Sequence, residues 1–487
     1  MIYFSDSYLL TKSQKYESLF FVENHRKLND TISAISTPKG EGGISIIRLS
    51  GPSSLSIIDK IFQPRSSRTK IASIETHTIT YGHIVNPKTH EVIDEVLVSV
   101  MLAPRTYTRE DIVEINCHGG SIPLLETLEL TLQMGARLAE PGEFTKRAFL
   151  NGRIDLIQAE AVADIVRAKT DLSLKVAVNQ LEGRLSKKIR QIRDIIMEVL
   201  VNIEASIDFP DEDIDIISLD TMSHKIDSAI EISKDLLSTA DDGRIITEGL
   251  KGVILGKPNV GKSSIFNALL NEDRALVTSI PGTTRDAIEE FINIDGVPVK
   301  LTDTAGIRQS DDVIEIESIA RAKMYLDQAD IILMVLDASS EITDEDRAII
   351  SLVANKKTII VINKIDLNRV LEIDNIQSLA PGKPVVSVSA RDERGFDLLR
   401  SAIKNMVLST DFLTADAVFV TRSRHKKAIK DAAESLEYAY MSIKNHNSPD
   451  LIAVDLRGAL RNIGEIVGEI ASDEILDQIF SKFCIGK

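Results

Sequence analysis

The chain of 487 residues has few of the features that define disulfide-rich secreted proteins, zinc-binding modules or membrane proteins. It has two cysteines, Cys117 and Cys484, which exclude a disulfide framework and a cysteine-rich zinc module. No apolar run approaches the ~20 residues needed to cross a bilayer, so we expect a cytoplasmic protein without a membrane segment. Its 57 Lys and Arg are outnumbered by 73 Asp and Glu, giving a net charge of −16. That charge argues against non-specific binding of nucleic acid over much of the surface but allows a local basic patch.

The pattern along the chain predicts several domains, about three by length. Residues 30–150 hold β-branched runs broken by Gly and Pro, whereas residues 156–209 contain one glycine, no proline and apolar residues at helical spacing. From about residue 249, strand-like and helical runs alternate, which is typical of βαβ units with a parallel sheet. The helical character returns after about residue 411. We therefore predict an α/β domain inserted into a helical one.

The expected division is a multidomain α/β and α protein with five segments. These are an extension, disordered or adventitious rather than targeting, at 1–29; an α+β domain at 30–150; a helical part at 151–248; the inserted α/β domain at 249–410; and a second helical part with a C-terminal tail at 411–487.

A glycine-rich loop between a predicted strand and a predicted helix is the strongest single motif. Residues 256–263 read GKPNVGKS and fit the pattern G-x-x-x-x-G-K-[ST]. In such a loop, backbone N–H groups and the N-terminus of the following helix bind phosphate. Lys262 is expected to reach the β- and γ-phosphates, and Ser263 to ligate Mg²⁺.

Three further motifs follow in order, each at the predicted end of a strand. DTAG at 303–306 offers an aspartate for the Mg²⁺ shell and a glycine N–H for the γ-phosphate. NKID at 363–366 offers a carboxylate that can accept both N1–H and the 2-amino group of guanine, neither of which adenine presents. Ser389-Ala390 offers a backbone N–H to guanine O6. The four motifs together predict GTP binding by a Ras-like P-loop domain.

The γ-phosphate side of this predicted site is unusual. Ile307 stands where Ras-like switches have the glutamine that orients the attacking water. Asp311, Asp312, Glu315 and Glu317 are candidates for that task, although most of them also suit the solvated start of a helix. No arginine finger is identifiable from the sequence.

Three further features each suit a structural role better than a functional one. Cys484 lies beside the end of the chain, and by itself it suits a buried cysteine better than a reactive thiol. Cys117, in Cys117-His118-Gly119-Gly120, suits a core or turn position. The acidic run at 208–215 suits a solvated loop better than a metal site.

Several short motifs outside the nucleotide site are also specific. They are Asp30-Thr31-Ile32, Gly42-Gly43-Ile44, Arg48-Leu49-Ser50-Gly51, CHGG at 117–120, PGEFT at 141–145, RAFLNG at 147–152, QAEA at 158–161, DFPDE at 208–212 and CIGK at 484–487. With the GTPase motifs, they make residues 30–487 resemble the tRNA modification GTPase MnmE (TrmE) family.

The resemblance implies a folate-binding, dimerising N-terminal domain and a homodimer. It implies an FAD-dependent partner, MnmG (GidA), in a heterotetramer that adds a carboxymethylaminomethyl or aminomethyl group to the wobble uridine of certain tRNAs. The one-carbon unit would come from 5-formyl-tetrahydrofolate or a related tetrahydrofolate. Arg48, Glu114, Arg153 and Lys487 fall at the family's folate-contacting positions, and Cys484 at its required cysteine. The family often has Lys at the place of Arg153.

The resemblance also implies hydrolysis activated by K⁺, which stands where an arginine finger would. The K⁺ positions are Asn259, Thr278, Ile280 and Thr283; the Mg²⁺ positions are Ser263 and Thr284; and Glu315 matches the glutamate that positions the water, with Glu317 as the alternative. The predicted GTP-contacting residues are Asn259, Val260, Gly261, Lys262, Ser263, Ser264, Thr278, Ser279, Ile280, Pro281, Gly282, Thr283, Thr284, Asp303, Thr304, Ala305, Gly306, Asn363, Lys364, Asp366, Ser389 and Ala390.

Two other functions fit the GTPase motifs. A ribosome-assembly GTPase of the Era or Der type would carry a KH-like domain or a second GTPase copy, and the sequence shows neither. A folate enzyme with a regulatory GTPase would turn folate over without a partner or tRNA.

Overall fold

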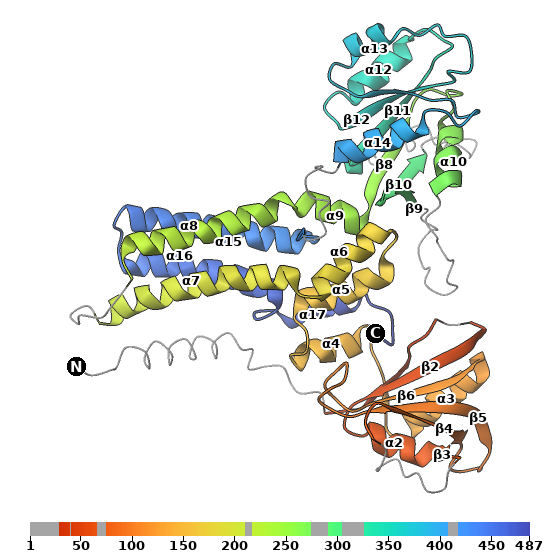
Figure 1. Ribbon diagram of the computed structural model, residues 1–487, viewed down its shortest axis with the longest axis vertical. Helices are drawn as coiled ribbons and strands as arrows, with labels where there is room; N and C mark the ends of the chain where they lie inside the picture. Colours follow the sequence, from red (N-terminus) through yellow and green to blue (C-terminus); the bar gives the residue numbers. More distant parts are fainter. Residues whose placement is uncertain are drawn as a thin grey trace, which may run out of the picture.

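The computed structural model describes residues 29–38, 40–65, 75–209, 217–273, 291–303, 326–407 and 417–487. Figure 1 shows three parts: an N-terminal sheet with helices packed on it, an elongated bundle of helices, and a second sheet flanked by helices. The expected fold class, α/β and helical domains combined, is confirmed. No helix among the described residues has the length and apolar content needed to cross a bilayer.

The N-terminal part is a seven-stranded sheet in the order β3-β4-β5-β6-β2-β1-β7. Neighbouring strands are antiparallel, except that β1 and β7 run parallel. Helices α2 (Ser54–Ile61) and α3 (Ser121–Gln133) pack on it, and their apolar faces close one core with the strands. The strands are β1 (Ile32–Ile35), β2 (Gly42–Ser50), β3 (Phe62–Pro64), β4 (Thr78–Val85), β5 (Val92–Met101), β6 (Ile112–Gly119) and β7 (Arg137–Leu138).

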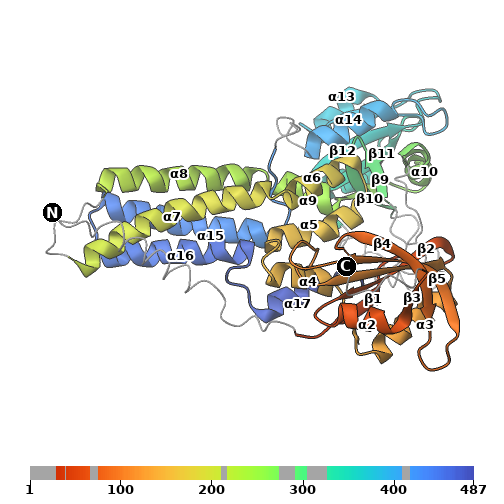
Figure 2. The ribbon, with the colours of Figure 1, turned by 60° about the horizontal axis from the view of Figure 1, so that its bottom comes forward.

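The helical part joins two stretches of chain that are far apart in the sequence. The long helices α7, α8, α15 and α16 lie side by side as a bundle (Figure 2) and share one apolar core. The helices before the inserted domain are α4 (Glu143–Leu150), α5 (Leu156–Arg167), α6 (Asp171–Leu181), α7 (Arg184–Asp208), α8 (Leu219–Ser238) and α9 (Ala240–Glu248). Those after it are α15 (Ser423–Lys444), α16 (Pro449–Val467) and α17 (Asp473–Phe480).

The inserted part is a six-stranded sheet in the order β13-β12-β11-β8-β10-β9. Its strands pair in parallel except for the edge strand β9, which the sequence reasoning missed. The strands are β8 (Leu250–Leu255), β9 (Phe291–Ile294), β10 (Val297–Asp303), β11 (Ile331–Asp337), β12 (Thr358–Asn363) and β13 (Val385–Ser387). The helices are α10 (Lys262–Asp273), α12 (Asp344–Leu352), α13 (Ile373–Leu379) and α14 (Phe396–Val407).

The inserted part enters and leaves the helical part at one place. Helix α9 leads into it, and the segment 417–422 leads back out. The backbone N–H of Val420 donates to the hydroxyl of Thr239 at 3.2 Å. A Cβ on Gly243 would lie 2.4 Å from the Val420 carbonyl oxygen, so only glycine allows α9 to approach this segment so closely.

A buried ionic cluster fixes the start of α15 to α5. Glu160 accepts hydrogen bonds from His425 at 2.9 Å and from Arg424 at 3.2 Å, and Asp164 pairs with Arg422. Burial opposes the charge of Glu160, but His425 and the two arginines lower the pKa of its carboxyl to about 2. For His425 itself burial is the larger effect, and it lowers the pKa of the ring despite Glu160.

A second buried cation organises the PGEFT and RAFLNG segments. Arg147 is 1% exposed and donates to Asp30 at 2.7 Å, to Glu143 at 3.0 Å and to Glu110 at 3.2 Å. A buried guanidinium needs charged partners to be stable. Glu143 supplies one from α4 itself, while Asp30 and Glu110 lie outside the helix and fix α4 against the N-terminal domain.

Candidate functional site

The phosphate-binding loop leaves strand β8 and ends at helix α10. Gly256 has φ 148°, and a Cβ there would lie 2.5 Å from the carbonyl oxygen of Val335 on the next strand. Asn259 is exposed with φ 63°, and Gly261 has φ 93°. These left-handed positions curl the loop and place Ser263 and Ser264 in the first turn of α10, where the helix N-terminus attracts anions.

The lysine of this loop is folded over its own backbone. The ammonium of Lys262 donates to the carbonyl oxygens of Gly256 at 3.0 Å and Lys257 at 2.8 Å, and the residue is largely buried. Lys257 in turn pairs with the buried Asp346 of α12 at 2.8 Å. The loop is therefore held in shape from both sides.

The second end of the nucleotide site lies after β12 and β13. The side-chain amide of Asn363 donates to the carbonyl oxygen of Val260 at 2.9 Å, and its oxygen accepts from the Ala390 N–H at 3.1 Å. One side chain thus joins the phosphate loop to both guanine motifs. Lys364, with φ 64°, pairs with Asp337 at 2.6 Å.

The predicted guanine-reading carboxylate is held in place. Ser389, fully buried, donates from its hydroxyl to Asp366 at 2.7 Å, and this hydrogen bond lowers the pKa of the Asp366 carboxyl. An ionised carboxylate with a free face suits two adjacent N–H donors on a ring.

Part of the predicted nucleotide and metal site lies outside the described residues. This applies to Thr278, Ser279, Ile280, Pro281, Gly282, Thr283, Thr284, Thr304, Ala305, Gly306, Glu315 and Glu317. Asp303 ends strand β10 and pairs in register with Ile254 of β8, which places its backbone beside the strand that feeds the phosphate loop.

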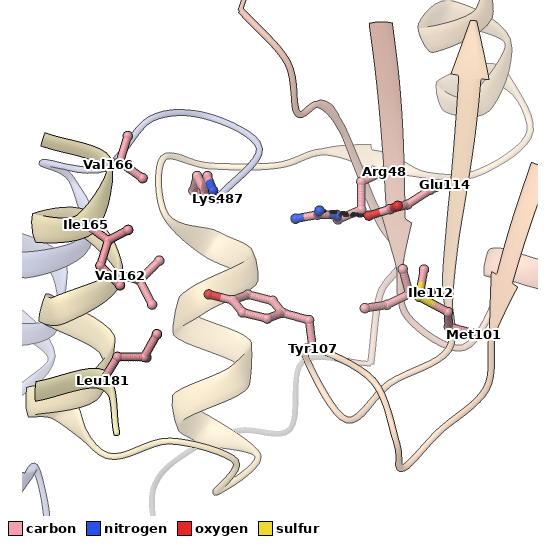
Figure 3. A pocket seen from close by; sticks show the side chains of 10 residues that line it. All are labelled: Arg48, Met101, Tyr107, Ile112, Glu114, Val162, Ile165, Val166, Leu181 and Lys487. Atoms are coloured by element: carbon pink, nitrogen blue, oxygen red, sulfur yellow. Dashed lines mark hydrogen bonds and ion pairs between the residues drawn. The ribbon is translucent and has the colours of Figure 1, made fainter. Parts of the chain in front are cut away.

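A second candidate site is a cavity of about 300 Å³ between the N-terminal sheet and helices α5 and α6. Figure 3 shows the Arg48–Glu114 pair on the sheet side, aliphatic side chains from the helices opposite it, and Lys487 entering from the C-terminal tail. The lining residues are Arg48, Met101, Tyr107, Ile112, Glu114, Val162, Ile165, Val166, Leu181 and Lys487. Three of the four predicted folate residues, Arg48, Glu114 and Lys487, thus lie on one cavity although they are distant in sequence.

The polar wall of this cavity is an ion pair. Arg48 on β2 donates to Glu114 on β6 at 2.8 Å from Nε and 2.7 Å from its terminal nitrogen. The two residues face each other in the strand register. A carboxylate beside a guanidinium can recognise a ligand that carries both a donor edge and an acceptor or anionic group.

The end of the chain is fastened to the same wall. The carbonyl oxygen of Gly486 accepts from the Ser36 hydroxyl at 3.1 Å and from Arg48 at 3.4 Å. Gly486 has φ 91°, and a Cβ there would lie 2.3 Å from the carbonyl oxygen of Ile35. The N–H of Gly142 donates to the Cys484 carbonyl oxygen at 3.3 Å. The tail therefore delivers Lys487 to the cavity by backbone contacts.

The two cysteines lie in opposite environments. Cys484 is exposed, three residues before the cavity-lining Lys487, unlike the buried cysteine that its sequence context favoured. Cys117 is buried in the core of the N-terminal sheet, and burial raises the pKa of its thiol to about 12. Only Cys484 is accessible to a reagent or substrate.

Sequence reasoning missed Tyr107. Its ring lines the cavity, and its hydroxyl shares a hydrogen bond of 2.9 Å with Thr145 of α4. The guanidinium of Arg153, the fourth predicted folate residue, lies 4.7 Å from the centre of the ring. The sequence signal was slight: an aromatic residue in a polar loop between two strands.

Comparisons with known proteins find relatives along nearly the whole chain. Residues 31–153 match the family described as the GTP-binding protein TrmE N-terminus, and residues 156–484 match the MnmE helical domain. The tRNA modification GTPase MnmE of Alkaliphilus metalliredigens is 50% identical over 94% of this chain and 100% of its own length. Those of Alkaliphilus oremlandii and Bacillus licheniformis are 48% and 47% identical, again over 94% of this chain and 100% of their own lengths. Among solved structures, the G domain of the T. maritima FeoB iron transporter is 26% identical over 33% of this chain and 99% of its own, with a TM-score of 0.25.

Proposed function

This chain belongs to the tRNA modification GTPase MnmE family, and on that premise we propose that it hydrolyses GTP as part of tRNA modification. The observation that carries the proposal is the bridge made by Asn363, which connects the phosphate loop at Val260 with the guanine motif at Ala390. The bridge sets the distance between a phosphate site and a purine-reading carboxylate, which is what a guanine nucleotide requires.

Within the nucleotide site, Lys262 has a clear task. Its ammonium, which now donates to two loop carbonyls, turns to the β- and γ-phosphates when GTP binds. The hydroxyl of Ser263, at the start of α10, suits a Mg²⁺ ion, which prefers oxygen ligands and adds substrate phosphates to them. Thr284 would complete the protein's share of that shell.

A monovalent cation would supply the positive charge that an arginine finger supplies elsewhere. Asn259 is exposed in the phosphate loop with a left-handed backbone, so its amide oxygen is available as a K⁺ ligand. We assign the remaining ligands to Thr278, Ile280 and Thr283, and the positioning of water to Glu315. Glu317, two residues further on, is the alternative.

The finer proposal for the cavity is that it holds a tetrahydrofolate that supplies a one-carbon unit. The ion pair of Arg48 and Glu114 offers a carboxylate and a cation to a pterin edge, while the aliphatic wall from α5 and α6 suits its ring faces. Arg153 and Lys487 add positive charge for the carboxylates of the folate tail. With FAD on the MnmG (GidA) partner, the product would be a carboxymethylaminomethyl or aminomethyl group on the wobble uridine.

An apolar outer face supports assembly through the N-terminal part. Ile79 and Tyr81 on β4 and Leu97 on β5 are 66%, 38% and 43% exposed, and Tyr81 pairs directly with Leu97 in the register. Three large apolar side chains on one exposed sheet face favour a protein contact. We assign that contact to a second copy, with MnmG completing a heterotetramer.

Nucleoside mass spectrometry of tRNA from cells that lack this protein tests the proposal. We expect the modified wobble uridines to disappear, and to return when the full chain is supplied but not when its Lys262→Ala variant is supplied. Unchanged wobble uridines in the deletion strain would overturn it.

A further inference from the structure

Helix α7 carries a segregated charge pattern that the nucleotide site and the cavity do not explain. Its first ten residues, 184–193, contain five Lys or Arg and no acidic residue, whereas residues 194–208 contain four Asp or Glu and no basic residue. Cations are unfavourable at the positive end of a helix dipole. The dipole acts only on the terminal turns, so helix stability does not account for a basic stretch of ten residues, and another reason for it is needed.

The basic half of α7 lies beside the turn that leads into α5. Arg190 pairs with Asp155, the N-cap of α5, at 2.7 Å. A Cβ on Gly183 would lie 3.4 Å from the amide of Gln158, also on α5. Lys187 stands one helical turn from each, on the same face, so it lies over this turn. Lys187 and its neighbour Lys188 are both exposed.

The same turn is flanked by arginines from the loop before β6 and carries one of its own. Arg109 donates to the carbonyl oxygen of Asn151 at 2.8 Å, and Arg153 stacks on the Tyr107 ring that lines the cavity. Arg105 precedes Tyr107 in the same loop. We name the set the basic rim; its members are Arg105, Arg109, Arg153, Lys187, Lys188 and Arg190, and all six are exposed.

The rim is poorly neutralised. Among the residues that the structure describes, Asp155 is the carboxylate that pairs with a member of the rim, through Arg190. Six exposed cations against one carboxylate form a local positive field on a chain with a net charge of −16. A polyanion is repelled by the average surface of this protein and attracted here.

We propose that the basic rim binds the phosphate backbone of an RNA whose target base is presented to the cavity. The proposal rests on the proposed function, because it takes tRNA as the substrate and the cavity as the place of the chemistry. RNA is favoured over an acidic protein because the rim reaches the cavity itself, where Arg153 stacks on the Tyr107 ring that lines it. A strip of lysines and arginines contacts backbone phosphates without reading sequence, which leaves base selection to the cavity and to any partner.

Salt-dependent tRNA binding by the full-length protein tests this surface. The test variant is Lys187→Ala/Lys188→Ala, since neither lysine is assigned to the nucleotide site or the cavity. The control is Lys88→Ala/Lys444→Ala, which removes two exposed lysines from the turn between β4 and β5 and from the end of α15. Fluorescence anisotropy with labelled tRNA, over a series of salt concentrations, gives both the affinity and its slope against log salt.

We expect the test variant to bind about tenfold more weakly at low salt, with a slope less steep by about 1 to 2, because each lost phosphate contact releases about 0.9 fewer counterions. GTP hydrolysis should match the unmodified protein, and the control should bind tRNA normally. A second variant, Arg105→Ala, should show half this effect from another segment of the rim.

An affinity and slope equal to those of the control would overturn the rim as an RNA surface. Loss of binding to the partner protein with normal tRNA binding would also overturn it, in favour of an acidic protein. Either result leaves the proposed function intact as long as the deletion strain loses its modified uridines. If those uridines persist in the deletion strain, the proposed function fails whatever the rim binds.

Discussion

The carboxylate of Asp366 accepts a hydrogen bond from the hydroxyl of Ser389 at 2.7 Å, across the ends of the neighbouring strands β12 and β13. This contact joins two motifs that are 23 residues apart and were chosen from the sequence for different contacts to guanine. It fixes the carboxylate in one orientation and lowers its pKa. The Asp366 carboxylate, which we expect to bind guanine, is therefore ionised and oriented before a nucleotide binds.

Asp366→Asn should exchange the nucleotide specificity. An amide cannot accept both N1–H and the 2-amino group, but it can donate to the additional carbonyl of xanthine. We expect discrimination in favour of GTP to fall by about 10⁴ to 10⁵, with a gain in binding of xanthosine triphosphate. Titration with fluorescent analogues of GTP and xanthosine triphosphate measures both affinities. The exposed Asp374→Asn on α13 serves as the control, and unaltered GTP affinity in Asp366→Asn would refute the assignment.

Hydrolysis should require K⁺ and not Na⁺. An ion held by Asn259 offsets the charge that develops on the γ-phosphate, a role that in other GTPases is worth about 10³ to 10⁵ in rate. Na⁺ is smaller and fits such a site poorly. Turnover in matched KCl and NaCl, with Asn259→Ala as a variant that should lose the difference, decides the point. Equal hydrolysis rates in KCl and NaCl would contradict a requirement for K⁺.

Gly486→Ala should detach the tail from the cavity. The new Cβ would lie 2.3 Å from the Ile35 carbonyl oxygen at a φ of 91°, so the backbone contacts to Ser36 and Arg48 must break. We expect loss of tRNA modification with GTP hydrolysis unchanged. Gly382→Ala is the matched control, because Gly382 has φ 76° with nothing within 4 Å and so tests backbone strain without a clash. Comparable activity in both variants would mean that the tail is not needed.

Cys484→Ser should abolish tRNA modification and spare GTP turnover. The thiol is exposed beside the tail's attachment to Gly142, within the part of the chain that brings Lys487 to the cavity. A thiolate can act as nucleophile or base there, and a hydroxyl of much higher pKa cannot. Both activities are measured on one preparation, with the exposed neighbour Ile485→Ala as control. Retained modification would leave Cys484 a structural residue.

Glu160→Gln should destabilise the helical part in a pH-dependent way. The folded-state pKa of Glu160 is depressed to about 2 from an ordinary value of 4.5. Its contribution is therefore present above pH 4.5 and is lost as the pH falls from 4.5 towards 2. Breaking a buried pair costs on the order of 3 kcal/mol. Thermal melts should show a lower Tm for Glu160→Gln at pH 7 and a smaller difference near pH 3.

The control for that experiment is Glu198→Gln, which breaks the exposed pair with Lys225. A surface pair contributes little, so its Tm should match that of the unmodified protein across the range. A Tm difference for Glu160→Gln that stays constant with pH would contradict the assignment of the charge.

The sequence predicted the nucleotide site and its strands because each motif there is local. A phosphate loop needs eight adjacent residues, and the parallel strands around it show as continuous apolar runs. The cavity is different, because Arg48, Glu114 and Lys487 meet only through folding, and the sequence linked them by family resemblance alone. Tyr107 had neither a motif nor a resemblance to mark it.

The QAEA and RAFLNG segments show the same limit. They were recognised as characteristic strings, but their purpose appears only in three dimensions. Glu160 meets Arg424 264 residues along the chain, and Arg147 meets Asp30 117 residues back. A buried charge and a surface charge look alike in a sequence, since the difference lies in partners that distant segments supply.

The shared core of α7, α8, α15 and α16 has a consequence for biosynthesis. Roughly 180 residues separate the end of α8 from the start of α15, so at about 5 to 20 residues per second the ribosome needs on the order of 10 to 40 s to make them. During that interval α7 and α8 can pack only on each other, and the apolar surface that α15 and α16 later cover stays exposed, while the inserted sheet can already fold. The nascent chain is therefore expected to bind chaperones until α15 and α16, in the last seventh of the protein, emerge and complete the bundle.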